Sequence, residues 1–252
     1  MRLSHHPALH AGELIDFLAR RAVPGVEEVV DGVYRRSLGD GVLQLRPGEE
    51  GVEVEGDPSA ARRILRLDAD PAAIEHRVGS DPLLGPLVRA APGRRVPGHP
   101  DIAELAVRAL LGQQISVAAA RTLAGRLTAE LGEPLARPVG GVTRRFPAPA
   151  ALAALDPETL PMPRARGRAL VRLAAALADG EPVTERLPGI GPWTTAYVAL
   201  RSGDDDAFLP TDLGVKHGLS ALGADPRRAA ELAEAWRPFR GFAVAHLWAA
   251  AS

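Results

Sequence analysis

The chain has 252 residues, of which 46% are hydrophobic, and a formal net charge of −1, so it can bury the core of one large domain or two small ones. It contains no cysteine, which excludes disulfide bonds, zinc–thiolate sites and iron–sulfur clusters within this sequence. No apolar run approaches the ~18 residues of a membrane span, and Met1–His10 lacks the apolar core of a signal peptide. We therefore expect a cytoplasmic protein that does not enter a membrane.

The first 90 residues combine helical and strand patterns. Apolar residues at helical spacing predict a helix near the start; they are Leu14, Ile15, Phe17 and Leu18. Three short runs separated by Gly- and Pro-containing turns predict antiparallel strands, which cover residues 32–38, 41–45 and 51–54. Helical character returns over residues 60–67 and 71–78. The Pro- and Gly-rich segment 86–100 then predicts a domain boundary.

From Asp101 onward the pattern is helical almost throughout, and Asp101 is placed to cap the first of these helices. The expected helices cover residues 101–111, 116–131, 149–155, 164–178, 192–201, 212–221, 226–236 and 240–250. Residues 134–149 are expected to form a solvated loop, and no strand is expected after Asp101. The sequence thus predicts an α+β protein, with a small mixed α/β domain over residues 1–90 and an all-α domain over residues 91–252.

Basic residues are concentrated in the second of these domains. Residues 91–252 contain 19 Lys and Arg against 16 Asp and Glu, whereas residues 1–90 contain 11 against 15. The net charge of the whole chain argues against a nucleic-acid partner, but this distribution permits DNA binding by the helical domain.

A glycine-rich turn leads directly into a predicted helix in the segment Leu187–Tyr197. Its members at the turn are Leu187, Pro188, Gly189, Ile190 and Gly191. Pro192 suits the first helical position, and the two glycines allow positive φ and close backbone approach. The uncapped N–H groups of such a helix start can bind a phosphate. On its own the pattern is more often a purely structural turn.

An acidic residue follows the turn after about twenty positions, in the segment Phe208–Lys216. Asp212 lies at the expected start of a helix. Two interpretations remain open from the residues alone: Asp212 caps that helix, or it supplies a carboxylate to an active site.

These segments together resemble the helix-hairpin-helix DNA glycosylases, and most closely the bacterial DNA-3-methyladenine glycosylase II (AlkA-type) family. The resemblance extends over nearly the whole chain in the family's order; it is strongest in 109–117, 187–197, 208–216 and 236–248, and also includes 16–23 and 34–38. The resemblance implies that residues 1 to about 90 form half of a TATA-binding-protein-like fold. It also implies a helical catalytic domain, and a bacterial protein of the cytosol or nucleoid.

The resemblance implies a reaction and a partner. A glycosylase must extrude the target nucleotide from duplex DNA to reach its glycosidic bond. Asp212 would support the oxocarbenium-like sugar that remains when an alkylated purine of the 3-methyladenine or 7-methylguanine type departs. The backbone of the turn, with Thr194, would bind DNA. No organic cofactor or side-chain metal site is expected, although relatives often hold Na⁺ or K⁺ on hairpin carbonyls such as that of Leu187.

The resemblance also assigns the base pocket and the type of reaction. Trp193 and Tyr197, four residues apart on one helix, and Trp248 would form an aromatic pocket in which a cationic base stacks. Trp193 occupies the position where bifunctional relatives carry a Schiff-base lysine, and Lys216 is the one lysine of the chain. We therefore expect a monofunctional glycosylase that acts as a monomer.

Two features depart from the family. Gln114 occupies the position of the residue that fills the gap left by the flipped base, where the best-known relatives have leucine, and Gln113 is expected to be structural. The segment before the hairpin is about a dozen residues shorter, so that only residues 183–186 remain for its first helix. These departures keep a second hypothesis open, a non-catalytic DNA-damage-binding protein. A glycosylase for oxidised or mismatched bases is a third; the absence of cysteine excludes its cluster-bearing branch, and Trp193 argues against its lysine-dependent branch.

Overall fold

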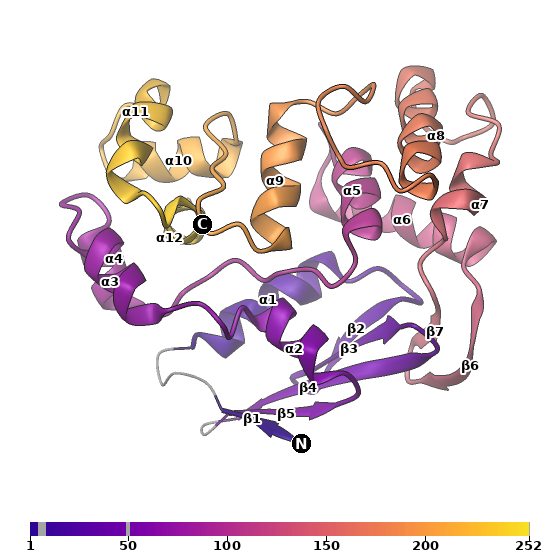
Figure 1. Ribbon diagram of the computed structural model, residues 1–252, viewed down its shortest axis with the longest axis horizontal. Helices are drawn as coiled ribbons and strands as arrows, with labels where there is room; N and C mark the ends of the chain where they lie inside the picture. Colours follow the sequence, from indigo (N-terminus) through magenta and orange to yellow (C-terminus); the bar gives the residue numbers. More distant parts are fainter. Residues whose placement is uncertain (5–8, 49–50, 252) are drawn as a thin grey trace.

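The computed structural model describes residues 1–4, 9–48 and 51–251. It contains a five-stranded antiparallel sheet built from the first 55 residues, with the strand order β1-β5-β4-β3-β2. The strands are β1 (Arg2–Leu3), β2 (Glu27–Val30), β3 (Val33–Leu38), β4 (Gly41–Gly48) and β5 (Gly51–Glu55). Two helices, α1 (Ala11–Arg21) and α2 (Pro58–Leu65), lie between this sheet and the helical part of the molecule (Figure 1).

The alternation of apolar residues explains how the sheet packs. Leu43 and Leu45 on β4, and Val52 and Val54 on β5, are buried, because alternate side chains of a strand point to one face. They form one core with α1 and α2, to which Leu14, Ile15 and Leu18 contribute.

The remaining chain is mostly helical, as the sequence predicts. The helices are α3 (Pro71–Gly79), α4 (Gly85–Ala90), α5 (Ile102–Leu111), α6 (Val117–Leu131), α7 (Pro149–Ala153), α8 (Arg164–Ala178), α9 (Pro192–Ser202), α10 (Leu213–Ala221), α11 (Ala229–Ala233) and α12 (Arg240–Ala250). Two 3₁₀ turns, Pro226–Arg228 and Glu234–Trp236, flank α11 and divide the single helix expected over residues 226–236. Asp101 caps α5 as predicted, since its side chain accepts the N–H of Glu104 at 2.9 Å. No helix among the described residues is long and apolar enough to cross a membrane.

Two hydrophobic cores hold the helices, and both include residues from the N-terminal part. The first joins Val23 and Val26 to α5, α6, α7, α8 and Val198 of α9. The second joins Phe17, α3 and α4 to Leu200 of α9 and to α10 and α12. The N-terminal residues therefore contribute to both halves of the helical part, on either side of α9 (Figure 1).

The prediction that residues 134–149 form a loop, within a domain without strands, is wrong. They contain a two-stranded hairpin, β6 (Pro134–Val139) and β7 (Val142–Arg144). A Gly140-Gly141 turn closes the hairpin, with φ +58° at Gly140. The carbonyl of Gly25 accepts the N–H groups of Thr143 and Arg144 at 2.8 and 2.9 Å. Pairing with a segment more than a hundred residues away therefore supplies the strand contacts that local sequence does not predict.

Candidate active site

A cavity of about 690 Å³ lies where α1, α5, α6, α9, α10 and α12 meet. Its lining includes all three residues predicted for a base pocket, Trp193, Tyr197 and Trp248, together with Asp212. The fold thus brings these four residues, which belong to three separate helical segments, to one cavity.

Asp212 both caps a helix and holds its carboxylate in the cavity, so the two interpretations left open by the sequence are compatible. As the N-cap of α10, its Oδ1 accepts the backbone N–H of Val215 at 3.0 Å. Two indole groups donate to the same carboxylate: Nε1 of Trp248 to Oδ1 at 2.8 Å, and Nε1 of Trp193 to Oδ2 at 2.9 Å. Hydrogen bonds to an ionised acceptor are short and strong, and here they fix the orientation of both oxygens.

The close approach of Trp248 to Asp212 depends on Gly214. A Cβ at this position would lie 2.7 Å from Cδ1 and 3.0 Å from Nε1 of Trp248, and 3.1 Å from Oδ1 of Asp212. Real Cβ atoms do not tolerate a 2.7 Å contact. Gly214 therefore makes room for the indole at the carboxylate.

Each of the two tryptophans stacks on a second aromatic ring. The rings of Trp193 and Tyr197 are 5.1 Å apart with an interplanar angle of 9°, as their spacing of four residues on α9 predicts. Trp248 stacks on Phe17 at 6.0 Å and 14°. Phe17 was predicted only as part of an amphipathic helix, because nothing in that pattern distinguishes a cavity residue from a core residue.

Arginine side chains also line the cavity, although the sequence patterns predict no arginine there. The guanidinium carbon of Arg21 lies 3.7 Å from the centroid of Phe17, and Nη1 of Arg201 lies 3.0 Å from the hydroxyl of Tyr197. Burial raises the pKa of Tyr197, but the charges of Arg201 and Arg21 outweigh burial and leave this pKa below its usual value. The aromatic pocket therefore has a cationic region.

The predicted DNA-binding turn, Leu187–Gly191, precedes α9 and packs directly on α8. Gly189 has φ +81°, and a Cβ there would lie 2.6 Å from that of Ala169, so a glycine is required. Gly191 has an extended conformation with φ −105°, which corrects the expectation of positive φ at both glycines. Ile190 is buried in the core and anchors the turn, while Pro188 and Gly189 are exposed.

Gln113 joins this turn to the loop between α5 and α6. Its amide donates to the carbonyl of Gly189 at 2.8 Å and to Oγ1 of Thr194 at 2.9 Å. The side chain of Thr194 is 1% exposed, so the prediction that Thr194 binds DNA directly is wrong; the hydroxyl instead accepts a hydrogen bond inside the protein. The adjacent Gln114 is exposed and has φ +59°, a conformation that is uncommon outside glycine and is often found at functional loops.

The expected shortening before the hairpin is visible in the structure. Residues 183–186 form no helix, and the preceding helix is α8, which ends at Ala178. Ile190 and Gly189 contact the core and α8 directly. The turn is therefore supported by α8 and not by a short helix of its own.

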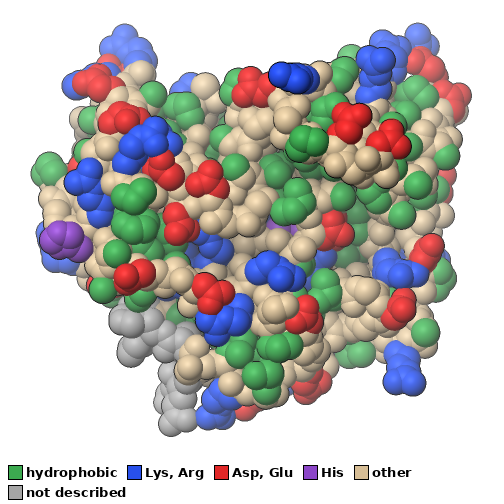
Figure 2. Space-filling view, viewed as in Figure 1, with side chains coloured by type: hydrophobic (Ala, Val, Ile, Leu, Met, Phe, Trp, Pro, Cys, Tyr) green, Lys and Arg blue, Asp and Glu red, His purple; other side chains and the backbone are tan. Residues whose placement is uncertain are grey.

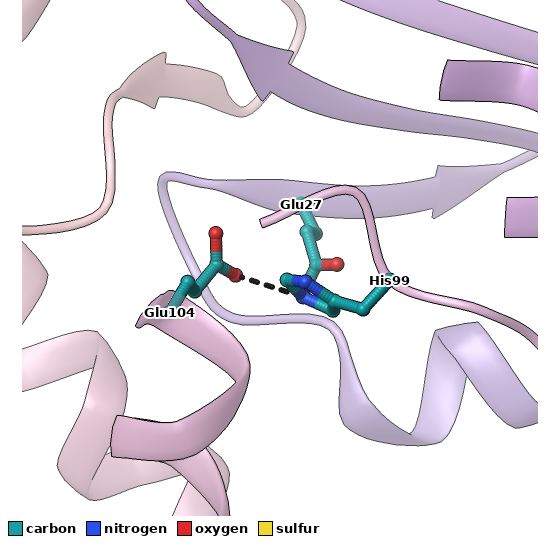
Figure 3. Close-up of side chains that lie close together, drawn as sticks. All are labelled: Glu27, His99 and Glu104. Carbon is teal, nitrogen blue, oxygen red and sulfur yellow. Dashed lines mark ion pairs between the residues drawn. The ribbon is translucent and has the colours of Figure 1, made fainter. Parts of the chain in front are cut away.

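A buried cluster of charged residues lies beside the cavity, where the N-terminal part meets α5. Glu27, His99 and Glu104 offer ligand atoms within 4.8 Å of one another (Figure 3). Two arginines already occupy the carboxylates: Arg108 Nη1 lies 2.8 Å from Glu27 and 2.7 Å from Glu104, and Arg36 Nη2 lies 2.7 Å from Glu104. The cluster balances its charges internally, so it fits an ion-pair network better than a metal site.

The arginines also control the protonation of this cluster. Burial raises the pKa of Glu104, but the charge of Arg36 and the neighbouring His99 outweigh burial and hold this pKa well below its usual value. Burial lowers the pKa of His99 despite the nearby Glu104. The network therefore keeps two ionised carboxylates inside the protein.

The chain is similar in sequence to known proteins. Residues 1–101 match the AlkA N-terminal domain family. The chain is 42% identical over 261 residues to the "Probable bifunctional transcriptional activator/DNA repair enzyme AlkA" of Mycobacterium tuberculosis; the match covers 92% of this chain and 53% of that protein, so this chain spans about half the length of that relative. It is 36% identical to "DNA-3-methyladenine glycosylase 2" of Escherichia coli, with 98% of this chain and 95% of that protein covered.

A solved structure shows the same fold. The 3-methyladenine DNA-glycosylase of Archaeoglobus fulgidus superposes with a TM-score of 0.80 at 21% identity, and the match covers 98% of this chain and 97% of that one. Near-complete coverage in both directions, together with the sequence identity to the E. coli protein, shows the family. The chain belongs to the AlkA (DNA-3-methyladenine glycosylase 2) family.

Proposed function

We propose that this protein is a monofunctional DNA glycosylase, which draws an alkylated purine of the 3-methyladenine or 7-methylguanine type out of duplex DNA and hydrolyses its N-glycosidic bond. The observation that carries the proposal is the Asp212 carboxylate, held in an aromatic cavity by the indole N–H groups of Trp193 and Trp248. The name of the E. coli relative supports a glycosylase for 3-methyladenine, and that of the M. tuberculosis relative supports a role in DNA repair.

Asp212 would act on the sugar while the aromatic rings hold the base. As the glycosidic bond breaks, its electron pair leaves with the base and the sugar becomes oxocarbenium-like. A fixed carboxylate stabilises that charge without reorganising, since its oxygens are already oriented. Water then adds to the anomeric carbon and gives up a proton to Asp212 or to solvent. An alkylated purine already carries a positive charge, so it can depart without a dedicated acid.

Duplex DNA would be held by the turn 187–191 and by Gln114. No side chain caps the start of α9, where Pro192 has no N–H and the N–H of Thr194 bonds to the carbonyl of Gly191. A phosphate would therefore be bound by the backbone N–H groups of Gly191 and Trp193. Carbonyl oxygens are the ligands that K⁺ and Na⁺ take, and that of Leu187 would contribute if relatives' cation binding extends to this turn. Basic and acidic side chains are interspersed on the face in Figure 2, so binding would depend on this local anchor and not on a broad positive field. We expect the protein to act as a monomer.

The proposal of a monofunctional reaction depends on the absence of a lysine at the sugar. Trp193 stands at the start of α9, and Lys216 lies on α10, where its backbone N–H bonds to the carbonyl of Asp212. Treatment of a reaction on methylated DNA with borohydride should trap no covalent adduct. An adduct that disappears in Lys216→Ala would show a lyase activity instead.

Asp212→Asn tests the proposed role of the carboxylate. Asparagine is also a good N-cap, so the variant should fold, but its amide nitrogen would face an indole N–H and its charge is lost. We expect release of 3-methyladenine and 7-methylguanine from methylated DNA to fall at least about 100-fold. Asp70→Asn, at the exposed N-cap of α3, is the matched control and should behave as wild type.

The alternative, a DNA-damage-binding protein without activity, is motivated by the missing helix before the turn and by Gln114. It predicts that wild type binds methylated duplexes and releases no base. Normal base release by Asp212→Asn would instead contradict the mechanism.

A further inference from the structure

The mouth of the cavity carries two kinds of exposed side chain. Ile115, Val117 and Leu213 line the cavity although they are 36%, 44% and 68% exposed. Exposed apolar residues that gather in one place mark a binding surface more often than scattered ones do. Arg20 and Arg121 also line the cavity and are exposed. The mouth therefore offers apolar contacts together with positive charge.

These two arginines come from neighbouring elements. Arg20 lies in the last turn of α1 and Arg121 near the start of α6, and α1 packs against α6. Asp212 and Leu213 stand at the start of α10, which lies on the other side of α9 from α6 (Figure 1). A nucleotide that enters the cavity would therefore meet the carboxylate on one side and the two arginines on the other.

The fold itself does not use these two guanidinium groups. Among the described residues, neither Arg20 nor Arg121 makes a hydrogen bond or an ion pair. Arg108 and Arg201 of the same cavity are, by contrast, held by carboxylates and by backbone carbonyls. Burial, and then the charges of Arg201 and Arg20, lower the pKa of Arg21, so cations repel one another on this side of the mouth. An anion bound among them would relieve that repulsion.

An extruded nucleotide brings such an anion. Its sugar is joined to a phosphate on each side, and both phosphates approach the mouth when the sugar reaches Asp212. The turn 187–191 would bind one of them. The other would approach the negative charge of Asp212 without a partner unless cations lie beside it. A guanidinium binds phosphate through paired N–H donors, which makes arginine well suited to this position.

We propose that Arg20 and Arg121 bind the second phosphate of the extruded nucleotide, the one that the turn 187–191 does not hold. This inference rests on the proposed glycosylase function. It gives α1, and thus the N-terminal part of the chain, a share in DNA binding that the sequence patterns do not predict. Two anchors would then hold the strand on both sides of the lesion, so that extrusion is stabilised without any contact to the base.

A phosphate contact at this position predicts a distinct pattern of effects. A phosphate carries no sequence information, so loss of the contact should weaken the binding of different lesions equally. Each phosphate contact that is lost should also reduce the slope of log K against log salt by about 0.9. Loss of a residue that contacts the base would instead change the preference between lesions and leave the salt dependence as it is.

The first test measures binding to a duplex with a tetrahydrofuran abasic site, which has no glycosidic bond to cleave. We expect Arg20→Met and Arg121→Met each to weaken binding about three- to fivefold at low salt, and the double variant to reduce the salt slope by about 0.9. Single-turnover base release from methylated DNA at saturating protein should fall less than the affinity. Arg126→Met is the matched control, because it removes an exposed arginine of α6 that does not line the cavity; it should bind as wild type.

The second test locates the phosphate. Neutral methylphosphonates replace, one at a time, the phosphates on either side of the abasic site. At the phosphate that the arginines contact, the replacement should weaken wild-type binding, and the double variant should then cause no further loss. A double variant whose loss is the same at every replaced position, or no larger than that of Arg126→Met, would overturn the proposal. Wild type that binds the abasic duplex but releases no base from methylated DNA would contradict the proposed glycosylase function alone, because the binding data still decide the role of the two arginines.

Discussion

Two groups of buried polar residues lie side by side in this molecule and treat charge in opposite ways. In the network at the start of α5, two carboxylates, Glu27 and Glu104, face two guanidiniums, Arg36 and Arg108, at distances of 2.7–3.4 Å. In the cavity, the partners of the Asp212 carboxylate among the described residues are N–H donors of neutral groups. In the network the positive and negative charges balance each other, whereas in the cavity the hydrogen-bond donors do not neutralise the charge of Asp212.

The difference separates carboxylates that are paired within the fold from one whose charge is open to a ligand. An ion pair satisfies the carboxylate and leaves little field for a ligand, whereas dipolar N–H donors orient the oxygens and leave the negative charge in place. The network is also where the N-terminal part meets the helices, since Arg36 belongs to β3 and Glu104 to α5. Balanced charges therefore join two parts of the molecule in one region, and the other region has the unbalanced carboxylate that the proposed reaction requires.

Breaking the balance of the network should have the largest effect on stability. Arg36→Met leaves an uncompensated carboxylate in a site where Arg36 is 2% exposed, and we expect the free energy of unfolding to fall by about 3–5 kcal/mol. Denaturant titration measures the change. Arg168→Met, which removes an exposed pair with Glu158, should cost less than about 1 kcal/mol. If Arg36→Met costs no more than this control, the network does not hold the two parts together.

The buried imidazole of His246 extends the comparison to the pH dependence of stability. Burial, followed by the charge of Arg94, lowers the pKa of His246 to about 4, against the opposing effect of Glu13. Because the folded pKa lies below the unfolded value of about 6.5, the unfolded chain binds more protons between these values. The contribution of neutral His246 to the free energy of unfolding should be fully present above pH 6.5. It should decline as pH falls toward 4, by up to about 3 kcal/mol.

His246→Gln should flatten this decline in denaturant titrations between pH 7 and 4. His217→Gln, at an exposed position of α10, is the control and should leave the slope unchanged. The carboxylates of the network do not mimic the effect at the upper end of this range, because the pKa values of Glu27 and Glu104 are lowered from their usual values and these residues lose their contribution only as pH falls through those lower values. An unchanged slope in His246→Gln would assign the decline to another group.

The smallest effect should come from removing a single N–H donor from Asp212. Trp248→Phe keeps an aromatic ring in the cavity but cannot donate to Oδ1, and Trp193→Phe does the same for Oδ2. We expect each to lower the single-turnover rate of base release about tenfold, corresponding to ~1.4 kcal/mol, with little change in stability. A rate equal to wild type in both variants would show that the indoles act only as stacking surfaces.

Much of the fold could be predicted because local signals agreed with the tertiary structure. Asp101 at a helix start, the 3.6-residue spacing of Leu14 and Leu18, and the turn at Gly39–Gly41 each have one favourable solution, and the structure adopts it. The prediction for residues 134–144 was wrong because their local signals do not agree with the tertiary structure. Their Gly140-Gly141 turn is a hairpin signal, but the arginine- and proline-rich strands become strands only through pairing with Gly25 and contacts with β3 and β4.

The site was predictable where chemistry is tied to a motif and unpredictable where it depends on packing. Asp212, Trp193, Tyr197 and Trp248 belong to recognisable segments and line one cavity. Arg21 and Phe17 lie on an ordinary amphipathic helix, and they line the cavity only because α1 packs against α9 and α12. Thr194 was misassigned because a helix start does not reveal which of its side chains face inward.

The hydrogen bonds of Gln113 have a mechanical consequence. Through the carbonyl of Gly189, Gln113 ties the loop that presents Gln114 to the turn at the start of α9, and Arg166 of α8 donates to the main-chain carbonyl of Gln113 at 2.7 Å. The loop that carries Gln114 and the turn before α9 are thus linked by hydrogen bonds within the protein itself. If both segments contact DNA as proposed, the spacing between the bound phosphate and the extruded nucleotide would be set by these bonds before a duplex binds.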